Sequence, residues 1–346
     1  MEVEKLLLEL VKIPSVSGNE KSVGKFIVER LKKNFKIRTQ IVDEAIGNFN
    51  IFAYIGKPKI LLNAHMDTVP GKLKVYEDKK NIYGRGACDT KASIASMIIA
   101  AERLLASGMT DFGLLFDVDE EGEFSGAKKV LSIIPKSVKL VVVGEPTKLK
   151  LVYGQNGIVD MKISCRGKSA HGSMPERGKN AIELIMSNLQ ILKELNLPEN
   201  ETLGANVINV AKISGGTAGN IVPDYAEVQV VIRSSVNSKL LLKSLMKKFY
   251  RCKLETLIFE PVVFPELTSI GKRLNIKTET VPYFTEMYFF SKKSKTFIFG
   301  PGDARYAHSE NERVSKSELA KAVEKYIEMA TLINEETLNK PDEVKK

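Results

Sequence analysis

The first half of the chain alternates segments of helical periodicity with short, uninterrupted apolar runs. Apolar residues recur at helical spacing in segments 4–11 and 20–35, and segment 90–107, rich in Ala, Ile and Met, is typical of a crossover helix. Compact apolar runs, which suit strands buried on both faces of a sheet, occupy segments 59–64, 113–118 and 139–143. This alternation predicts an α/β layer architecture.

A different order of elements begins near Gly154. The pattern predicts, in sequence, a strand, a helix, two strands, a helix and a strand, over segments 158–165, 181–194, 205–213, 226–233, 238–249 and 252–258. This β-α-β-β-α-β order is that of the ferredoxin-like unit. Because a strand at 295–299 and a helix at 316–333 resume the first pattern, we predict that residues 154–261 form a domain inserted between 1–153 and 262–346. Pro261 and Pro265 suit a return linker, and the polar tail 334–346 is expected to fray.

Length and composition fit this two-domain interpretation. With 346 residues, 43% hydrophobic and 27% charged, the chain is long enough for about two globular domains. The formal charge of +10 comes from scattered lysines without an aromatic-interleaved basic stripe, so no nucleic-acid partner is expected. No apolar stretch approaches the roughly 18 residues of a membrane span, and residues 1–10 lack the features of a secretory signal. We therefore expect a cytoplasmic protein without a membrane partner, whose cysteines, Cys88, Cys165 and Cys252, are reduced.

Histidines and carboxylates gather just past the predicted strand ends. They are His65, Asp67, Asp89, Glu120, Glu121, Glu145 and His308. Several have an ordinary alternative: His65 could be a loop histidine with Asp67 capping the next turn, Asp89 could cap the following helix, and Glu120 and Glu121 could belong to a solvated acidic loop. The carboxyl edge of an α/β sheet is where ligands bind, and imidazole and carboxylate groups that converge there suit zinc. Since one ion does not need so many carboxylates, we predict a two-metal hydrolytic site.

In combination, these motifs resemble those of a known family. His65-x-Asp67, Gly84-Arg85-Gly86-x-x-Asp89-x-Lys91, Asp119-Glu120-Glu121-x-x-x-x-Gly126-Ala127, Gly144-Glu145-Pro146 and the late His308 are similar to the dinuclear zinc amidohydrolases that include acetylornithine deacetylase, succinyl-diaminopimelate desuccinylase, aminoacylase and carboxypeptidase G. The resemblance extends over nearly the whole chain. It implies an α/β zinc-hydrolase catalytic domain with an inserted ferredoxin-like α+β lid domain.

The resemblance also implies a role for each residue. His65 and Glu145 would bind one metal, His308 and Glu121 the other, and Asp89 would bridge the two. Zinc is expected, with cobalt and manganese as alternatives. Glu120 would be the general base, and Asp67 would orient His65.

The inserted domain supplies further candidates. His171 matches the lid histidine of the family, which in dimeric relatives reaches the partner's site, so the resemblance implies a homodimer through the lid. Thr217 and Asn220, in segment 215–223, and Arg233 resemble the substrate-binding residues. A guanidinium such as that of Arg233 suits a substrate carboxylate, although Arg233 could instead form an ordinary ion pair.

Segments 175–184 and 283–286, with Gly300-Pro301-Gly302, favour a deacetylase of N-acetylornithine or N-acetyllysine. Three alternatives remain: a hydrolase that frees lysine or ornithine from an acidic amino-group carrier protein, a succinyl-diaminopimelate desuccinylase, and a di- or tripeptidase. The chain departs from the common pattern at Cys88 and at Tyr306-Ala307, neither of which removes a ligand.

Overall fold

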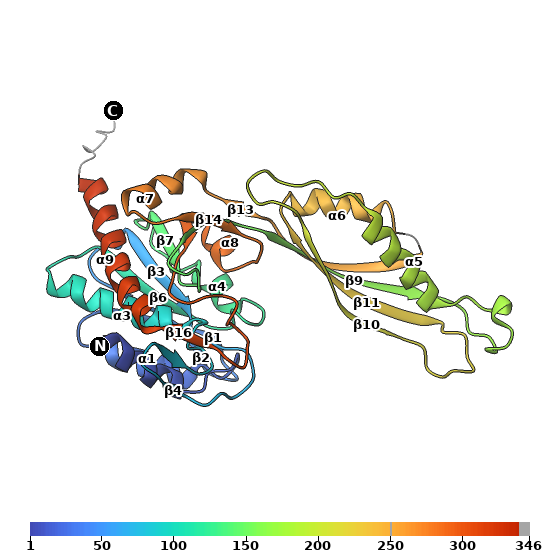
Figure 1. The fold of residues 1–346 in the computed structure, drawn as a ribbon, viewed down its shortest axis with the longest axis horizontal. Helices are drawn as coiled ribbons and strands as arrows, with labels where there is room; N and C mark the ends of the chain where they lie inside the picture. Colours follow the sequence, from blue (N-terminus) through green and yellow to red (C-terminus); the bar gives the residue numbers. More distant parts are fainter. Residues whose placement is uncertain (250, 339–346) are drawn as a thin grey trace. The chain divides into compact units, whose positions relative to one another are not determined.

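The computed structural model describes residues 1–249 and 251–338 and has a mixed α/β fold, which confirms the predicted class. The described residues form two units (Figure 1). Unit 1 contains Met1–Tyr153, Phe264–Glu279 and the described part of Phe289–Lys346, and unit 2 contains Gly154–Val263 and Thr280–Tyr288. Each unit has its own hydrophobic core.

Unit 1 is built on a mixed sheet with the strand order β1-β2-β6-β3-β7-β15-β8. The central strands β6, β3, β7 and β15 are parallel, while β1, β2 and β8 pair antiparallel. The bounds are β1 Lys36–Asp43, β2 Asn48–Tyr54, β3 Ile60–His65, β6 Phe112–Asp117, β7 Leu140–Val143, β8 Leu151–Gln155 and β15 Lys295–Ile298. All residues of β3, β6 and β7 are buried, as their uninterrupted apolar sequences predict.

Helices cover this sheet. α3 (Lys91–Ala106) is buried along most of its length and packs against α1 (Glu2–Lys12), α9 (Lys316–Leu338) and β3. α2 (Lys21–Leu31) packs on β2. Shorter elements complete the unit: α4 Ser125–Val130, the 3-10 helix η2 Pro265–Leu267, α7 Thr268–Arg273, and a small sheet of β4 Tyr76–Glu77, β5 Asn81–Tyr83 and β16 Arg313–Ser315.

Unit 2 has the predicted β-α-β-β-α-β order and an antiparallel sheet with the strand order β10-β11-β9-β12. Its elements are β9 Gly157–Arg166, α5 Ala181–Glu194, β10 Val207–Gly215, β11 Tyr225–Ser234, α6 Ser238–Met246 and β12 Cys252–Phe259, with the 3-10 helix η1 Pro175–Arg177. Burial alternates along β9 and β11 because one side chain in two enters the core with α5 and α6.

The predicted domain boundary after the insertion differs from the observed units in two short segments. Residues 262–346 were all expected in the first domain, but Val262–Val263 (β13) and residues 280–288 belong to unit 2. β13 pairs with the end of β8, and Phe284 stacks on Phe259 with ring centroids 5.0 Å apart. β14 (Thr278–Val281) and α8 (Met287–Phe290) run across this boundary. Residues 280–288 therefore belong to unit 2, where Phe284 packs, although the order of the chain placed them in the first domain.

Two further expectations are corrected. Cys165 and Cys252 form a disulfide, although all three cysteines were expected to be reduced. The antiparallel pairing of β9 with β12 puts these residues directly opposite each other, at a Cα–Cα distance of 4.3 Å, despite a sequence separation of 87. Cys88 is free and buried.

The tail also differs, because α9 continues through residues 334–338; positions 339–346 lie outside the described residues. Within the described residues, no helix is both long and apolar enough to cross a membrane.

Candidate metal centre

The parallel strands of unit 1 bring most of the predicted ligands to one edge of the sheet. His65 is the last residue of β3, Glu120 and Glu121 follow β6, and Glu145 follows β7. Because β3 is parallel to both β6 and β7, these ends meet. Asp89 does not follow a strand of this large sheet, as was expected. It lies in the segment between β5 of the small sheet and α3.

Asp89 stands between the two histidines. One carboxylate oxygen, Oδ1, is 3.1 Å from His65 Nε2, and the other, Oδ2, is 3.2 Å from His308 Nε2. Glu145 completes one triad at 3.9 Å from His65, and Glu121 completes the other at 2.7 Å from His308. The potential ligand atoms of each triad lie within 4.8 Å of one another. The structure thus brings together all five predicted ligands as two groups that share Asp89.

This arrangement excludes the simpler interpretation of Asp89 as a helix cap. The N-cap residue of α3 is Thr90, and the Thr90 hydroxyl donates to the main-chain carbonyl of His65 at 2.9 Å. The carboxylate of Asp89 faces the histidines instead.

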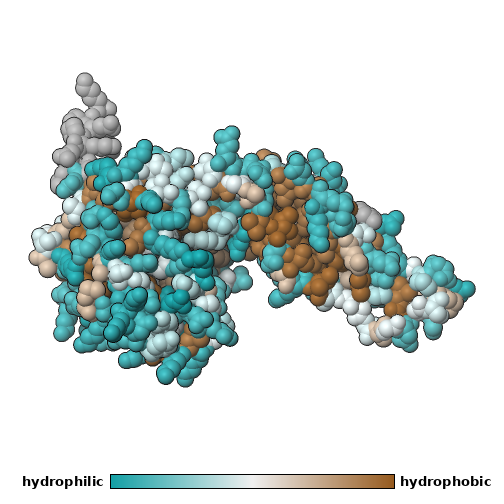
Figure 2. Space-filling model, viewed as in Figure 1, coloured by the Kyte–Doolittle hydropathy of each residue, from teal (hydrophilic) through white to brown (hydrophobic). Residues whose placement is uncertain are grey.

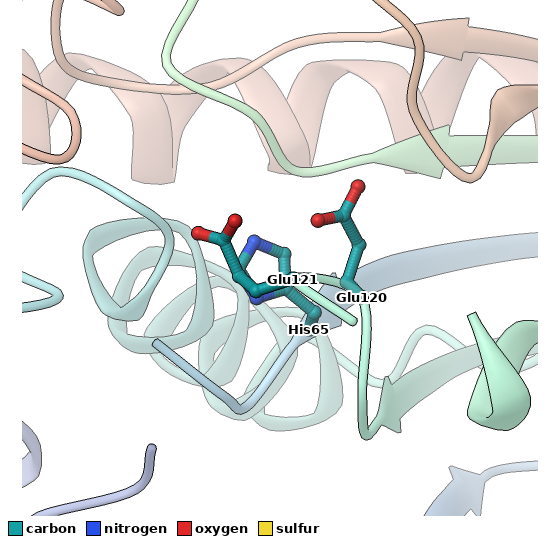
Figure 3. A group of neighbouring side chains, drawn as sticks. All are labelled: His65, Glu120 and Glu121. Atoms are coloured by element: carbon teal, nitrogen blue, oxygen red, sulfur yellow. The ribbon is translucent and has the colours of Figure 1, made fainter. Parts of the chain in front are cut away.

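Glu120 belongs to a third group of possible ligands, with His65 and Glu121. Figure 3 shows the three side chains gathered together, with the ring of His65 between Glu121 and Glu120. One carboxylate oxygen of each glutamate and one ring nitrogen of His65 lie within 4.8 Å of one another. Burial, with the nearby carboxylates Glu121, Asp67 and Asp89, raises the pKa of Glu120 well above its usual value, although His65 opposes the change.

Asp67 holds this cluster in place through several contacts. Its Oδ1 and Oδ2 accept the backbone N–H groups of Glu120 and Glu121 at 3.1 and 3.0 Å, and Ser17 Oγ donates to Oδ2 at 2.7 Å. His65 Nδ1 lies 3.0 Å from the main-chain carbonyl of Asp67 and 3.4 Å from its carboxylate. If Nδ1 carries the proton, Nε2 keeps its lone pair on the Asp89 side.

The charges of the cluster suit bound cations. Burial and Asp89 raise the pKa of Glu145, while hydrogen bonds to Asp89 and Glu121 raise the pKa of His308 to about 10. Burial alone would raise the pKa of Asp89, but hydrogen bonds from His308 and His65 outweigh it and lower the pKa. The raised pKa values of Glu145 and His308 mean that these two side chains hold protons tightly where several carboxylates meet. Divalent cations would supply the same positive charge, and the set of imidazole and carboxylate donors fits zinc-like ions.

The candidates in unit 2 fall into two places. His171 is exposed, and an isolated bridge joins it to Ile221, beside Thr217 and Asn220. The Gly172 N–H donates to the Asn220 carbonyl at 2.7 Å. Arg233 instead lies at the other end of β11, opposite Ile158. The structure groups His171 with Thr217 and Asn220 but leaves Arg233 apart from them.

Sequence reasoning missed Glu312 and Arg85 as parts of the site. Glu312 is 1% exposed and accepts hydrogen bonds from the loop that carries Asp89. Its signal in the sequence is a carboxylate four residues after His308, and Arg85 lies in the Gly84-Arg85-Gly86 motif.

Comparison with known proteins agrees with this geometry. The profile described as "Peptidase family M20/M25/M40" matches residues 61–332. A probable carboxypeptidase of Aspergillus flavus is 31% identical over 92% of this chain and 87% of its own length. A Staphylococcus aureus tripeptidase shares the fold with a TM-score of 0.82 at 19% identity, over 96% of this chain and 98% of that one. The Bacillus subtilis YXEP protein, a dinuclear metal-binding M20 peptidase, has a TM-score of 0.72 at 18% identity, over 96% and 98%.

Proposed function

Because the chain belongs to the peptidase family M20/M25/M40 and is one of its metal-dependent hydrolases, we propose that it cleaves the amide bond of a small substrate with a free carboxylate, and that short peptides are its first candidates. The observation that carries this proposal is the pair of triads that share Asp89. The similarity to a probable carboxypeptidase along most of both chains supports a peptide substrate.

The residues divide the metal binding between them. His65 and Glu145 would hold one ion, His308 and Glu121 the other, and Asp89 would offer one oxygen to each. Zinc is the ion we propose, with cobalt and manganese as alternatives. When bound, such ions lower the pKa of a water molecule and polarise an amide carbonyl.

Glu120 is proposed to transfer the proton. Its carboxylate takes a proton from the attacking water and then delivers it to the leaving amine. The backbone N–H of Glu120 is held by Asp67, so the position of this carboxylate is set by the strand end that also carries His65. A base that is placed in advance in this way needs little reorganisation during the reaction.

His171 is proposed to stabilise the negative charge that develops on the substrate oxygen. Its Nδ1 accepts the backbone N–H of Ser173 at 3.2 Å, so the proton of the neutral ring lies on Nε2. This Nε2–H is the donor that an oxyanion requires. Thr217 and Asn220 lie on the adjoining segment and would contact the same substrate, whereas Arg233 would bind a substrate carboxylate.

The distance between Arg233 and His171 supports a homodimer. Arg233 is eight residues beyond Tyr225 on β11, roughly 26 Å at about 3.3 Å per residue, and the His171 end of unit 2 lies near the start of β11. One small substrate cannot touch both residues of a single chain. We therefore propose that each site takes His171 from a second copy.

An edge strand is available for this association. β10 is exposed throughout and lies at the edge of the unit 2 sheet, with Val207 48%, Val210 41% and Ile213 59% exposed. Figure 2 shows hydrophobic residues gathered on the surface of unit 2 over its strands. An unpaired edge with apolar side chains is suited to a partner strand.

A second candidate is the deacetylation of N-acetylornithine or N-acetyllysine, or release of lysine or ornithine from an acidic carrier protein. The motif Gly300-Pro301-Gly302 favours it, and it packs against the site: a Cβ added at Gly300 would lie 2.5 Å from the Glu145 carbonyl oxygen. The formal charge of +10 favours the acidic carrier.

The test is a comparison of amine release. Purified protein is loaded with Zn²⁺ or Co²⁺, and its bound metal is measured by elemental analysis. Its kcat/KM is then measured for a dipeptide and tripeptide panel, N-acetylornithine, N-acetyllysine, N-succinyl-diaminopimelate and carrier-linked lysine. We expect two metals per chain and the highest kcat/KM with a peptide. A higher value for an acylated amino acid would select the second candidate, and fewer than two metals would contradict the dinuclear site.

A further inference from the structure

We infer that Glu312 is a positioning residue that fixes Asp89 and His308 relative to each other, an inference that rests on the proposed dinuclear site. Glu312 is 1% exposed and lies four residues after His308. Its Oε1 accepts the backbone N–H groups of both Cys88 and Asp89, each at 3.1 Å. The main chain of the shared ligand is therefore bonded directly to this side chain.

The second oxygen of Glu312 has a partner as well. Arg85 Nη1 donates to Oε2 at 2.6 Å, and Arg85 Nε donates to the Gly71 carbonyl at 3.3 Å. Arg85 is 15% exposed, so both charges of this pair are largely removed from water. Removal of one partner of a buried ion pair strongly destabilises a protein, because the other charge is left buried and unpaired. Both carboxylate oxygens of Glu312 therefore attach it to the loop 84–89.

The backbone adds a second connection between the same two segments. Arg313 of β16 pairs with Tyr83 of β5, and the Gly84 N–H donates to the Glu312 carbonyl at 3.2 Å. Glu312 thus binds the loop 84–89 with its main chain at one end and with its side chain at the other. His308 belongs to the segment that leads into Glu312, so these bonds set the 3.2 Å separation between His308 Nε2 and Asp89 Oδ2.

His308 needs such support. Its φ of +60° lies in the left-handed region, which is uncommon for residues other than glycine and persists only where the surroundings impose it. His308 is also 51% exposed, so little packing holds its ring. The bonds of Glu312 lie close enough along the chain to hold this conformation.

The same arrangement occurs at Asp67, which accepts the backbone N–H groups of Glu120 and Glu121. In both places a buried carboxylate binds two consecutive N–H groups of a segment that carries a metal-ligand candidate. Asp67 serves the segment after β6, and Glu312 serves the segment before α3. Residues that orient metal ligands in this way typically change metal affinity by about 10- to 100-fold when they are replaced.

The experiment is a titration of metal-free protein with Co²⁺ alone. Calorimetry measures the affinity of each Co²⁺ ion, and the visible absorption spectrum reports its coordination. The variant is Glu312→Gln, which has the same shape but cannot accept from the backbone and from Arg85 at once. We expect the second Co²⁺ to bind about 10- to 100-fold more weakly, with an altered spectrum.

Glu260→Gln is the matched control. Glu260 also accepts two consecutive backbone N–H groups, those of Ser238 at 2.6 Å and Lys239 at 3.3 Å, but it lies in unit 2. It should lower thermal stability without changing Co²⁺ affinity. If a merely structural role applied to Glu312, its variant would behave like this control.

Wild-type affinities and an unchanged spectrum in folded Glu312→Gln would overturn the inference. If this variant does not fold, Arg85→Lys, which keeps the charge but loses the fork of donors, decides in its place by the same two readouts. Binding of fewer than two Co²⁺ ions by the wild-type protein would instead contradict the proposed function on which the inference rests.

Discussion

The two histidine-bearing regions of this protein are built in opposite ways. In unit 1, His65 is 1% exposed and Asp67 and Asp89 lie against its two ring nitrogens. In unit 2, His171 and the residues up to Arg177 are exposed, and Ser173 holds the ring. Buried carboxylates that lie close together repel one another and keep their geometry only if other groups impose it, whereas a single exposed donor can stay in water until it is needed.

This difference separates two kinds of mutational effect. Changes at the proposed metal ligands of unit 1 should alter metal binding and, through it, all catalysis. Changes at His171 should leave the metals in place and alter only the reaction rate, because a donor to the oxyanion acts mainly in the transition state.

The largest expected effect is that of Asp89→Ala. Since Asp89 faces both histidines, its loss should lower the occupancy of both metals and reduce activity to the detection limit. His308→Ala should affect chiefly one metal. Elemental analysis of both variants after identical loading measures the difference, and full occupancy in Asp89→Ala would rule out the shared ligand.

Glu120→Gln should retain both metals and lose about 100- to 10,000-fold in kcat, because only the proton transfer is removed. Glu123→Gln, an exposed neighbour in the same loop, serves as the control and should keep wild-type kinetics. Loss of a metal from Glu120→Gln would reassign this residue as a ligand.

His171→Ala should reduce kcat by about 100- to 1,000-fold, with KM and metal content little changed. Mixing this variant with Glu120→Gln should restore part of the activity, because a mixed dimer contains one site with both groups intact. Mixed dimers that form but stay inactive would argue against a shared site.

The smallest effect on the reaction is expected from reduction of the Cys165–Cys252 disulfide. Closing a chain segment of 87 residues should stabilise unit 2 by about 2–4 kcal/mol, so reductant should lower its unfolding free energy by that amount. Metal binding by unit 1 should be unchanged. Denaturant unfolding and Co²⁺ titration, each with and without reductant, test the two statements, and an equal loss of metal affinity would show that the units are coupled.

The sequence by itself determined the elements whose pattern is local. Uninterrupted apolar runs identified β3, β6 and β7, and helical periodicity identified α5 at its observed bounds. The ligand candidates could be recognised because they follow such runs, so that His65 and Glu145 meet once the strands are parallel. The strand β1 was missed because it is largely exposed and lacks a continuous apolar run. The strand β2 was missed although it is mostly buried, because Asn48 and Asn50 interrupt its apolar residues.

Only the tertiary structure decided the relations between distant segments. The pairing of β9 with β12 joins Cys165 to Cys252, the pairing of β5 with β16 brings Glu312 to Asp89, and aromatic packing assigns Phe284 to unit 2. Local periodicity reports which face of an element is buried, but it does not encode which strand lies beside which or in what register. The groups that hold the ligands in place depend on that register, and for this reason they emerged from the fold and not from the pattern.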